Sequence, residues 1–406
     1  MRRIGCPLAA LALFGAGQAC GDFKNAGGGG APDGSVGDAP VADAGEAGVA
    51  SDAGAPGEGG ADSATEGGNG GRPCTAAACP PVVMADDLHF PVALAVDALH
   101  LYWIEAGNGV SDPDAPLVRI LKSAPCLKST DPCRGVLDPM AGGDAFQGLS
   151  LAVGPGQACY TQTYDTPSAY SVNCVTFDSA GTRGVYQGTG AAVQIVATAD
   201  TIAWADFGQA AAASQGAIFA VPADAGFNAD AQALAAARPG PVGLAADGPS
   251  LVWTEYGTTA DAGAVQRAAL DGGAPVVLAG GQQSPGSVAV YAGYVYWTSV
   301  GDGTVRGMKD DGTGAVETFA SGEKRPVAVA VAATGVYWIN AGTGPDYLDG
   351  ALRRVDLAGG TPTTMMANIV NLQALAIDDT DVYVCNAGTT GNQFHDGTIW
   401  QMAQTY

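Results

Sequence analysis

The segment Val295-Tyr296-Trp297-Thr298-Ser299 recurs along this sequence of 406 residues, and its copies indicate the fold. A fixed period in a glycine-rich chain is typical of a repeat architecture. Seven units share an apolar and aromatic segment that ends in a polar residue, and the units stand 41 to 57 residues apart. The copies are Leu101–Glu105, Ala158–Gln162, Ile202–Asp206, Leu251–Glu255, Val295–Ser299, Val336–Asn340 and Val382–Asn386, of which the second is the most degenerate.

Each unit contains signals for four short strands. An apolar run without polar alternation, such as Val327-Ala328-Val329-Ala330-Val331, precedes the aromatic segment and predicts a strand covered on both faces. A third strand follows, and a turn such as Asp271-Gly272-Gly273 leads to a fourth, Pro275–Leu278, because glycine supplies the positive φ that tight hairpins need. The pattern predicts an all-β fold, a β-propeller of seven four-stranded blades. Six blades are the alternative if the degenerate second unit is an insertion.

The two ends of the repeat region complement each other. The last unit stops after its third strand, Gly397–Met402, and leaves no residues for a fourth. Pro81-Val82-Val83-Met84-Ala85, before the first unit, resembles the fourth strand of another unit. We therefore expect this N-terminal strand to complete the last blade, which removes the open sheet edges that promote aggregation.

Five of the six tryptophans occupy one place in the repeated segment. Blades converge at the propeller axis and diverge outward, so a large ring at a fixed position fills the wedge between neighbouring blades. We interpret these tryptophans as core residues with no ligand-binding role.

The repeat resembles the YWTD repeat of extracellular propellers. The resemblance covers roughly residues 91–406 and is carried by Val295-Tyr296-Trp297-Thr298 followed by Gly303-Thr304-Val305-Arg306. It departs from the family in blade number, which is typically six, and in the Asp of the motif, which is Glu, Ser or Asn here. The resemblance implies the fold and a binding role and transfers no ligand. Broadly similar seven-bladed relatives include lyases that depend on histidines and a metal.

Residues 1–72 indicate export and a tether. Met1-Arg2-Arg3, an apolar run and Gly17-Gln18-Ala19-Cys20 resemble a bacterial lipoprotein signal, in which Cys20 becomes the lipidated N-terminus. Ordinary cleavage near Ala19 is the alternative. We predict a signal peptide over 1–20, a disordered Gly/Ala/Asp-rich linker over 21–72 and the propeller over 73–406, because the linker holds too little apolar surface to fold.

The charge balance limits the partners. Residues 73–406 carry 31 acidic and 13 basic side chains, so nucleic acid and anionic lipid are repelled. We predict no nucleic-acid binding, no membrane contact other than the lipid anchor, and a monomer.

The cysteines fit a disulfide-forming compartment. Three pairs are close in sequence or symmetric about a turn, and one cysteine is left over. The candidate pairs are Cys74 with Cys79, Cys126 with Cys133, and Cys159 with Cys174. Cys385 is predicted to be a buried thiol, with pairing to Cys74 or Cys79 as the alternative. The spacings do not match zinc sites.

The polar residues that end the repeated segments fall on one end of every blade. These residues, with one nearby histidine, form the candidate binding face: Glu105, Asp206, Glu255, Asn340, Asn386 and His395. The alternative is that they hydrogen-bond to neighbouring loops. The adjoining loops vary most in length, which is typical of recognition sites on a rigid scaffold, and their composition would also allow weak calcium binding.

No nucleophile, phosphate-binding loop or catalytic histidine pattern is evident, so no catalytic, cofactor or metal residue is predicted. We expect an envelope-anchored or secreted binding or scaffold module for a protein, peptide or glycan. The alternatives are a metal-assisted propeller lyase or hydrolase, and a purely structural envelope protein.

Overall fold

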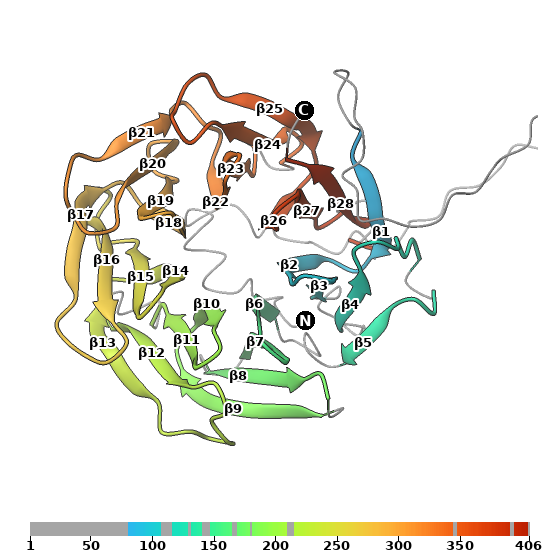
Figure 1. Ribbon diagram of the computed structural model, residues 1–406, viewed down its shortest axis with the longest axis horizontal. Coiled ribbons are helices and arrows are strands. Elements are labelled where there is room, and N and C mark those ends of the chain that lie inside the picture. The colour runs from blue at the N-terminus through green and yellow to red at the C-terminus, as the bar shows by residue number, and fades with distance from the viewer. Residues whose placement is uncertain are drawn as a thin grey trace, which may run out of the picture. The chain divides into compact units, whose positions relative to one another are not determined.

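The computed structural model describes residues 80–106, 116–128, 131–139, 147–164, 169–178, 181–208, 215–343, 347–389 and 394–404. The signal, the linker, Cys20, Cys74 and Cys79 lie outside these ranges. The described residues form seven four-stranded antiparallel sheets arranged as a ring (Figure 1). The chain is therefore a seven-bladed β-propeller, as predicted, and the degenerate second unit is a complete blade.

The blades follow one another in chain order, each running from an inner to an outer strand. Blade 1 comprises β2 (Pro91–Val96), β3 (His100–Glu105), β4 (Leu117–Leu121) and β5 (Gly135–Asp138); blade 2, β6 (Gln147–Gly154), β7 (Gln157–Tyr164), β8 (Ala169–Thr176) and β9 (Thr182–Thr189); blade 3, β10 (Ala192–Ala197), β11 (Thr201–Asp206), β12 (Gly216–Pro222) and β13 (Gln232–Arg238). Blade 4 comprises β14 (Pro241–Asp247), β15 (Ser250–Glu255), β16 (Gly263–Ala269) and β17 (Val276–Gln282); blade 5, β18 (Pro285–Tyr291), β19 (Tyr294–Ser299), β20 (Thr304–Lys309) and β21 (Glu317–Ala320). Blade 6 comprises β22 (Pro326–Ala332), β23 (Gly335–Asn340), β24 (Gly350–Val355) and β25 (Thr363–Ile369); blade 7, β26 (Leu372–Ile377), β27 (Asp381–Asn386), β28 (Gly397–Ala403) and the N-terminal β1 (Val82–Leu88).

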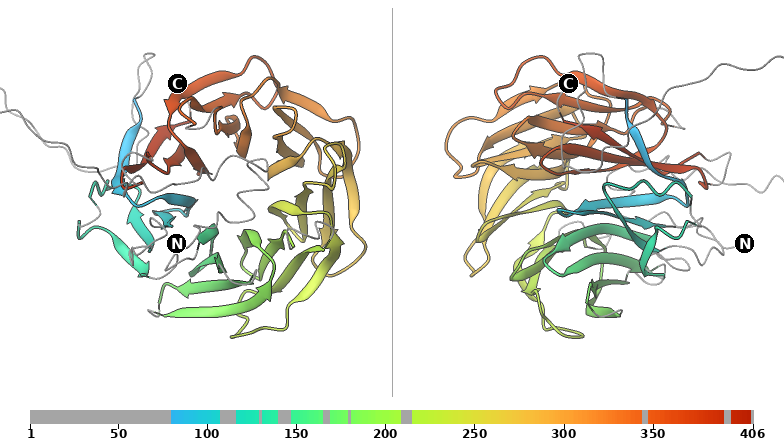
Figure 2. Two further views of the ribbon diagram at one scale, coloured as in Figure 1. Left: turned by 180° about the vertical axis from the view of Figure 1, so that it is seen from behind. Right: turned by 45° about the vertical axis from the view of Figure 1, so that its right-hand side comes forward.

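The N-terminal strand closes the ring. β1 pairs antiparallel with β28, with Val82 opposite Gln401 and Leu88 opposite Gly397, and Figure 2 shows the two ends of the domain meeting there. Met84 and Leu88 are fully buried against the core shared by blades 7 and 1. The predicted closure is confirmed.

Large rings fill the space between blades. The five tryptophans of the repeated segments are fully buried, and Trp253, for example, packs with Ala203 and Ile218 of the preceding blade. Small hydroxyls join the inner strands of neighbouring blades, because Ser150 Oγ accepts the N–H of Ile195 at 3.1 Å and Ser287 Oγ accepts that of Val329 at 3.2 Å. The tryptophans are core residues, as predicted.

Five links from an outer strand to the next inner strand share one geometry. The central residue of each has a positive φ, and its carbonyl accepts the N–H of the residue after the second strand of the next blade. The pairs are Phe90 with Ala106, Gly240 with Tyr256, Ser284 with Val300, Arg325 with Ala341 and Asn371 with Ala387, at 2.8–3.1 Å. The links therefore lie on the same end of the propeller as the loops between second and third strands.

The described residues contain no helix, and none of them forms a helical segment long and apolar enough to cross a membrane.

Two disulfides connect cysteines close in sequence. Cys126 and Cys133 are bonded with their Cα atoms 5.9 Å apart, and Cys159 and Cys174, directly opposite on β7 and β8, are bonded with Cα atoms 4.0 Å apart. Two of the three predicted pairs are confirmed, and the third, Cys74 with Cys79, lies outside the described residues. Cys385 is a buried free thiol, and burial raises its pKa to about 12.

Candidate functional site

The polar residues that end the second strands lie at one end of the blades, but their side chains are buried. Glu105, Asp206, Glu255, Asn340 and Asn386 are each at most 8% exposed. A ligand at this end would therefore contact the loops above them first. Most polar atoms of these residues are engaged within the propeller; Asn340 Nδ2 donates to Glu323 at 2.6 Å, whereas Asn340 Oδ1 is buried with no hydrogen-bond partner.

Glu105 binds the tryptophan of its own strand. Its carboxylate accepts hydrogen bonds from Trp103 Nε1 at 2.9 Å and from the backbone N–H of His89 at 2.8 Å, and it pairs with Arg134. The guanidinium of Arg134 also lies over the Trp103 ring, 5.3 Å from its centroid. A carboxylate with a cation and several donors is well satisfied in a buried site.

Glu255 forms the same arrangement in blade 4. It accepts from Trp253 Nε1 at 2.9 Å, from Arg238 Nε of the preceding blade at 2.5 Å and from Gln266 Nε2 at 3.2 Å. This partly buried ion pair therefore joins two blades.

In blades 5 and 6 the acceptor for the tryptophan N–H comes from the preceding blade. The second strands there end in Ser299 and Asn340, and the indole N–H groups of Trp297 and Trp338 instead bind Gln282 at 3.2 Å and Glu323 at 3.0 Å. Each acceptor also receives an arginine, Arg306 at 2.8 Å and Arg353 at 3.4 Å. Sequence reasoning missed Gln282 and Glu323, although each stands 15 residues before its tryptophan.

The remaining residues of the series are also engaged locally. Asp206 Oδ1 accepts the N–H groups of Ala191 at 3.0 Å and Gly208 at 2.8 Å, and burial raises the pKa of this carboxyl above its usual range. Asn386 Oδ1 accepts the N–H of Thr398 at 2.7 Å. The series thus holds strand ends and loops in place.

His395 meets a second histidine, His89, which the sequence analysis did not single out. The rings of His395 and His89 lie edge to face with their centroids 4.1 Å apart. His89 precedes the first inner strand and His395 precedes β28, so closure of the ring brings them together. Nothing local in the sequence links residues so far apart.

Two loops at this end of the propeller are anchored in the same way. In blade 6, Asp349 accepts the N–H and the hydroxyl of Thr343 at 2.6 and 3.0 Å, and Lys324 donates to it at 2.7 Å. The hydrogen bond from Lys324, followed by that from the Thr343 N–H, lowers the pKa of Asp349 to about 2. In blade 7, Asp396 accepts the N–H and the hydroxyl of Thr389, both at 2.6 Å. We call these two pairs the loop clamps.

The backbone around each loop clamp is also equivalent. Gly342 and Gly388 have φ of 92° and 83°, and a Cβ there would lie within 2.5 Å of the clamp carboxylate, so only glycine fits. Tyr347 and Phe394 both have positive φ, and their carbonyls accept the N–H of Asn371 and Phe90 at 3.0 Å. The shared pattern is Gly-Thr, a tip, an aromatic residue, any residue, Asp and Gly. The tips, 344–346 and 390–393, lie outside the described residues.

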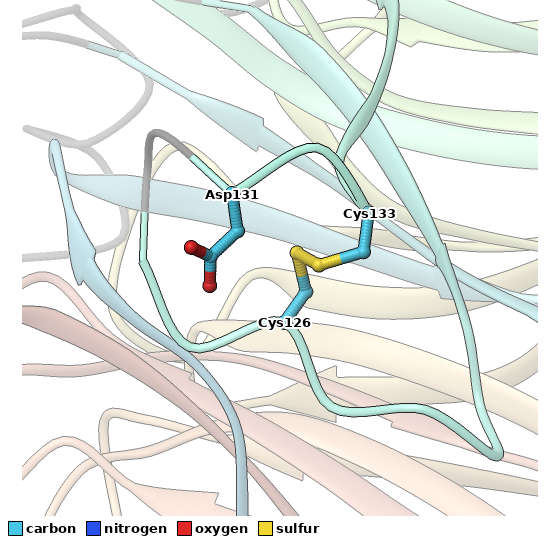
Figure 3. Close-up of side chains that lie close together, drawn as sticks. All are labelled: Cys126, Asp131 and Cys133. Atoms are coloured by element: carbon cyan, nitrogen blue, oxygen red, sulfur yellow. A yellow bond between two sulfur atoms is a disulfide. The ribbon is translucent and has the colours of Figure 1, made fainter.

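Among the described residues, the one group of three potential metal-ligating side chains is Cys126, Asp131 and Cys133. Figure 3 shows that the two sulfurs are bonded to each other beside the Asp131 carboxylate. This group therefore offers no thiolates to a metal. The expected weak calcium binding by the loops stays a prediction.

A cavity of about 590 Å³ lies at the opposite end, between blades 2 and 3. Its wall includes Arg183, which donates to Gln157 Oε1 at 2.8 Å and to the Ala223 carbonyl at 3.1 Å, and the exposed Asp200 and Asp224. None of the predicted site residues lines it.

No protein-family model and no curated protein matches this sequence. Solved structures of similar shape include a catalytically inactive virginiamycin B lyase from Staphylococcus aureus with quinupristin, at 9% identity and TM-score 0.55, over 80% of this chain and 98% of the lyase. The WD40 β-propeller domain of Doa1 matches at 12% identity and TM-score 0.53, over 79% of this chain and 96% of that one. A prolyl endopeptidase matches at 10% identity and TM-score 0.50, over 78% of this chain and half of its own.

These structures share a propeller and differ in function. At such low identity they show the fold alone, and a fold that serves lyases, peptidases and WD40 domains does not identify a ligand. The comparisons therefore support a β-propeller repeat protein and leave the YWTD type as a resemblance of the sequence.

Proposed function

We propose that this protein is an exported binding or scaffold module that recognises its partner through the loops between second and third strands. The observation that carries the proposal is the pair of loop clamps on neighbouring blades. Each fixes the base of a loop with two hydrogen bonds to one carboxylate, and the two tips differ in length and sequence. Variable loops held by a rigid scaffold are the usual arrangement of a recognition site.

The residues beside the loop clamps suit recognition. Leu348 is 57% exposed, and Tyr347, which precedes it, stacks under the guanidinium of Arg325 at 4.8 Å from the ring centroid. Aromatic and arginine side chains are enriched at interfaces because they offer a large, rigid area with polar edges. The partner we propose is a protein, peptide or glycan of the cell envelope.

Export and anchoring are part of the proposal. The two disulfides fit an oxidising compartment. Residues 1–20 would direct export, Cys20 would carry the lipid, and residues 21–72 would hold the propeller away from the membrane. Palmitate labelling that persists in the native chain and disappears in Cys20→Ser would support the anchor.

Affinity capture with the full chain tests the binding role. One variant carries Gly-Ser replacements at 344–346 and 390–393, and a matched control carries the same replacement at 313–315, an exposed turn at the opposite end of blade 5. A defined envelope protein or a glycan that binds the native and control chains with the same affinity, and the loop variant at least tenfold more weakly, supports the proposal. Equal binding by all three chains overturns it.

The competing proposal, a metal-assisted lyase or hydrolase, requires turnover as well as binding. Stoichiometric metal together with product formation that survives the tip replacements would favour that alternative.

A further inference from the structure

The seam where the propeller closes brings together two of the three histidines of the chain. His89 belongs to the link between β1 and β2, and His395 to the loop between β27 and β28. Their rings are half-buried and edge to face, 4.1 Å between centroids. Imidazole is the commonest protein ligand of metals and suits Zn²⁺ and Ni²⁺, so two rings held side by side offer two such ligands.

The backbones beneath these rings are fixed. Phe90 N–H donates to the Phe394 carbonyl at 3.0 Å, and the rings of these two residues also pack edge to face, 4.8 Å between centroids. The N–H of His89 donates to Glu105 Oε2 at 2.8 Å. The imidazoles therefore remain close together while blades 7 and 1 are joined, and parting of these two blades would separate them.

The electrostatic surroundings favour a cation. Asp396 follows His395 directly, and Asp86 and Asp87 lie three and two residues before His89. Glu105 is nearer to His89 but is paired with Arg134. A domain with 31 acidic and 13 basic side chains also concentrates divalent cations near its surface.

We propose that His89 and His395 form a two-imidazole site for a transition metal of the Zn²⁺ or Ni²⁺ type, which clasps the closure seam. Tetrahedral zinc with Zn–N bonds of about 2.0 Å places two ring centroids about 5 Å apart, so the rings must separate by about 1 Å. Side-chain rotation supplies such a movement. Water fills the remaining positions. A metal that binds the closed ring and not the open chain stabilises closure by mass action.

This inference is independent of the proposed ligand-binding role, since it concerns the seam and not the loop tips. It is tested on the untagged full chain by histidine-selective NMR during a Zn²⁺ titration with excess Mg²⁺ present. His100, which bonds to Asp97 in the turn between β2 and β3, is the internal control. We expect the ring signals of His89 and His395 to shift together and to saturate at one Zn²⁺ per chain, while those of His100 stay in place.

Two matched variants complete the test. His395→Gln should abolish the saturable shift of His89 and any rise of Tm with Zn²⁺, whereas His100→Gln should retain both. The inference is overturned if Zn²⁺ leaves the His89 and His395 signals unchanged, if it moves all three histidines alike, or if His395→Gln binds as the native chain does. The NMR titration of the native chain decides the question even if a variant folds poorly.

Discussion

At the scale of single residues, the buried tryptophans show how the blades are joined. Each indole N–H of blades 1, 4, 5 and 6 binds a carboxylate or amide that is also bound by an arginine. Where the second strand ends in Glu, that residue is the acceptor, and where it ends in Ser299 or Asn340, the preceding blade supplies it. In all four blades the buried indole N–H needs an acceptor, but the acceptor stands at different positions in the sequence.

Glu255→Gln tests this network. The amide still accepts from Trp253, but Arg238 loses its carboxylate in a buried site, so we expect a loss of about 1–3 kcal/mol in the free energy of unfolding. Urea denaturation measures it. Glu317→Gln makes the same chemical change at an exposed residue and should cost less than about 0.5 kcal/mol. Equal losses in the two variants would show that the network adds nothing to stability.

Asp206 predicts a pH dependence. Burial raises its folded-state pKa, so the folded protein holds this proton more tightly than the unfolded chain. The contribution of this tighter proton binding to the free energy of unfolding is fully present below the unfolded-state pKa of about 4. It is lost as pH rises through the folded-state pKa. The Asn side chain of Asp206→Asn does not titrate, so this variant does not lose that stabilisation. Its free energy of unfolding should therefore rise relative to that of the native chain between pH 4 and pH 7. Denaturation at several pH values measures this. A difference between Asp206→Asn and the native chain that stays constant over this pH range would contradict the assignment.

At the scale of elements, the two loop clamps separate a fixed base from a variable tip. The glycine before the threonine and the aromatic residue after the tip adopt positive φ, and the Asp then returns the chain to the third strand. The pattern recurs in blades 6 and 7 although the tips differ. A loop of this kind can change its tip in evolution without disturbing the blade.

Thr389→Val tests the loop clamp of blade 7. Valine keeps the shape of threonine and removes the hydroxyl that donates to Asp396, so amide exchange across 388–397 should accelerate about tenfold or less, while global stability changes by about 1 kcal/mol or less. Hydrogen exchange with mass spectrometry measures it. Thr364→Val, at an exposed position of β25, should leave exchange in the loop unchanged. Faster exchange in both variants would refute the clamp.

At the scale of the whole molecule, stability depends on closure by β1. Met84 and Leu88 of this strand are buried with Trp103 of blade 1 and Cys385 of blade 7. Lys122 of blade 1 also pairs with Asp378 of blade 7 at 2.6 Å. The last blade lacks an outer strand without β1, so opening the seam exposes a sheet edge and a shared core together.

Leu88→Ala should therefore destabilise the whole ring by about 2–5 kcal/mol. Cys385 reports the opening, because burial raises the pKa of its thiol to about 12 and its Sγ lies 3.6 Å from the Pro91 carbonyl across the seam. Its alkylation at pH 8, followed by peptide mass spectrometry, should be slow in the native chain and at least tenfold faster in Leu88→Ala. Leu99→Ala, at a residue 65% exposed, is the control and should label as the native chain does. Rapid native labelling would contradict a closed seam.

The sequence by itself determined the repeat, the propeller fold and the closing strand; it favoured seven blades over six and proposed three cysteine pairs, two of which the structure shows. These features are local or periodic. A strand buried on both faces, a glycine turn and a tryptophan at a fixed position each produce a recognisable pattern within a unit. Cys159 and Cys174 are symmetric about one turn. The hydrophobic pattern specifies strands and faces, and a four-stranded repeat has few ways to bury them.

Only the tertiary structure decided which partners the polar residues take. Glu105 and Glu255 bind tryptophans in their own strands, Gln282 and Glu323 bind tryptophans of the following blade, and His89 meets His395 across the seam. A buried N–H group can donate to any acceptor that the packing brings within hydrogen-bond distance. Its partner is therefore set by how neighbouring blades and the two chain ends pack. The number of residues between two such partners in the sequence does not indicate how close they lie in space.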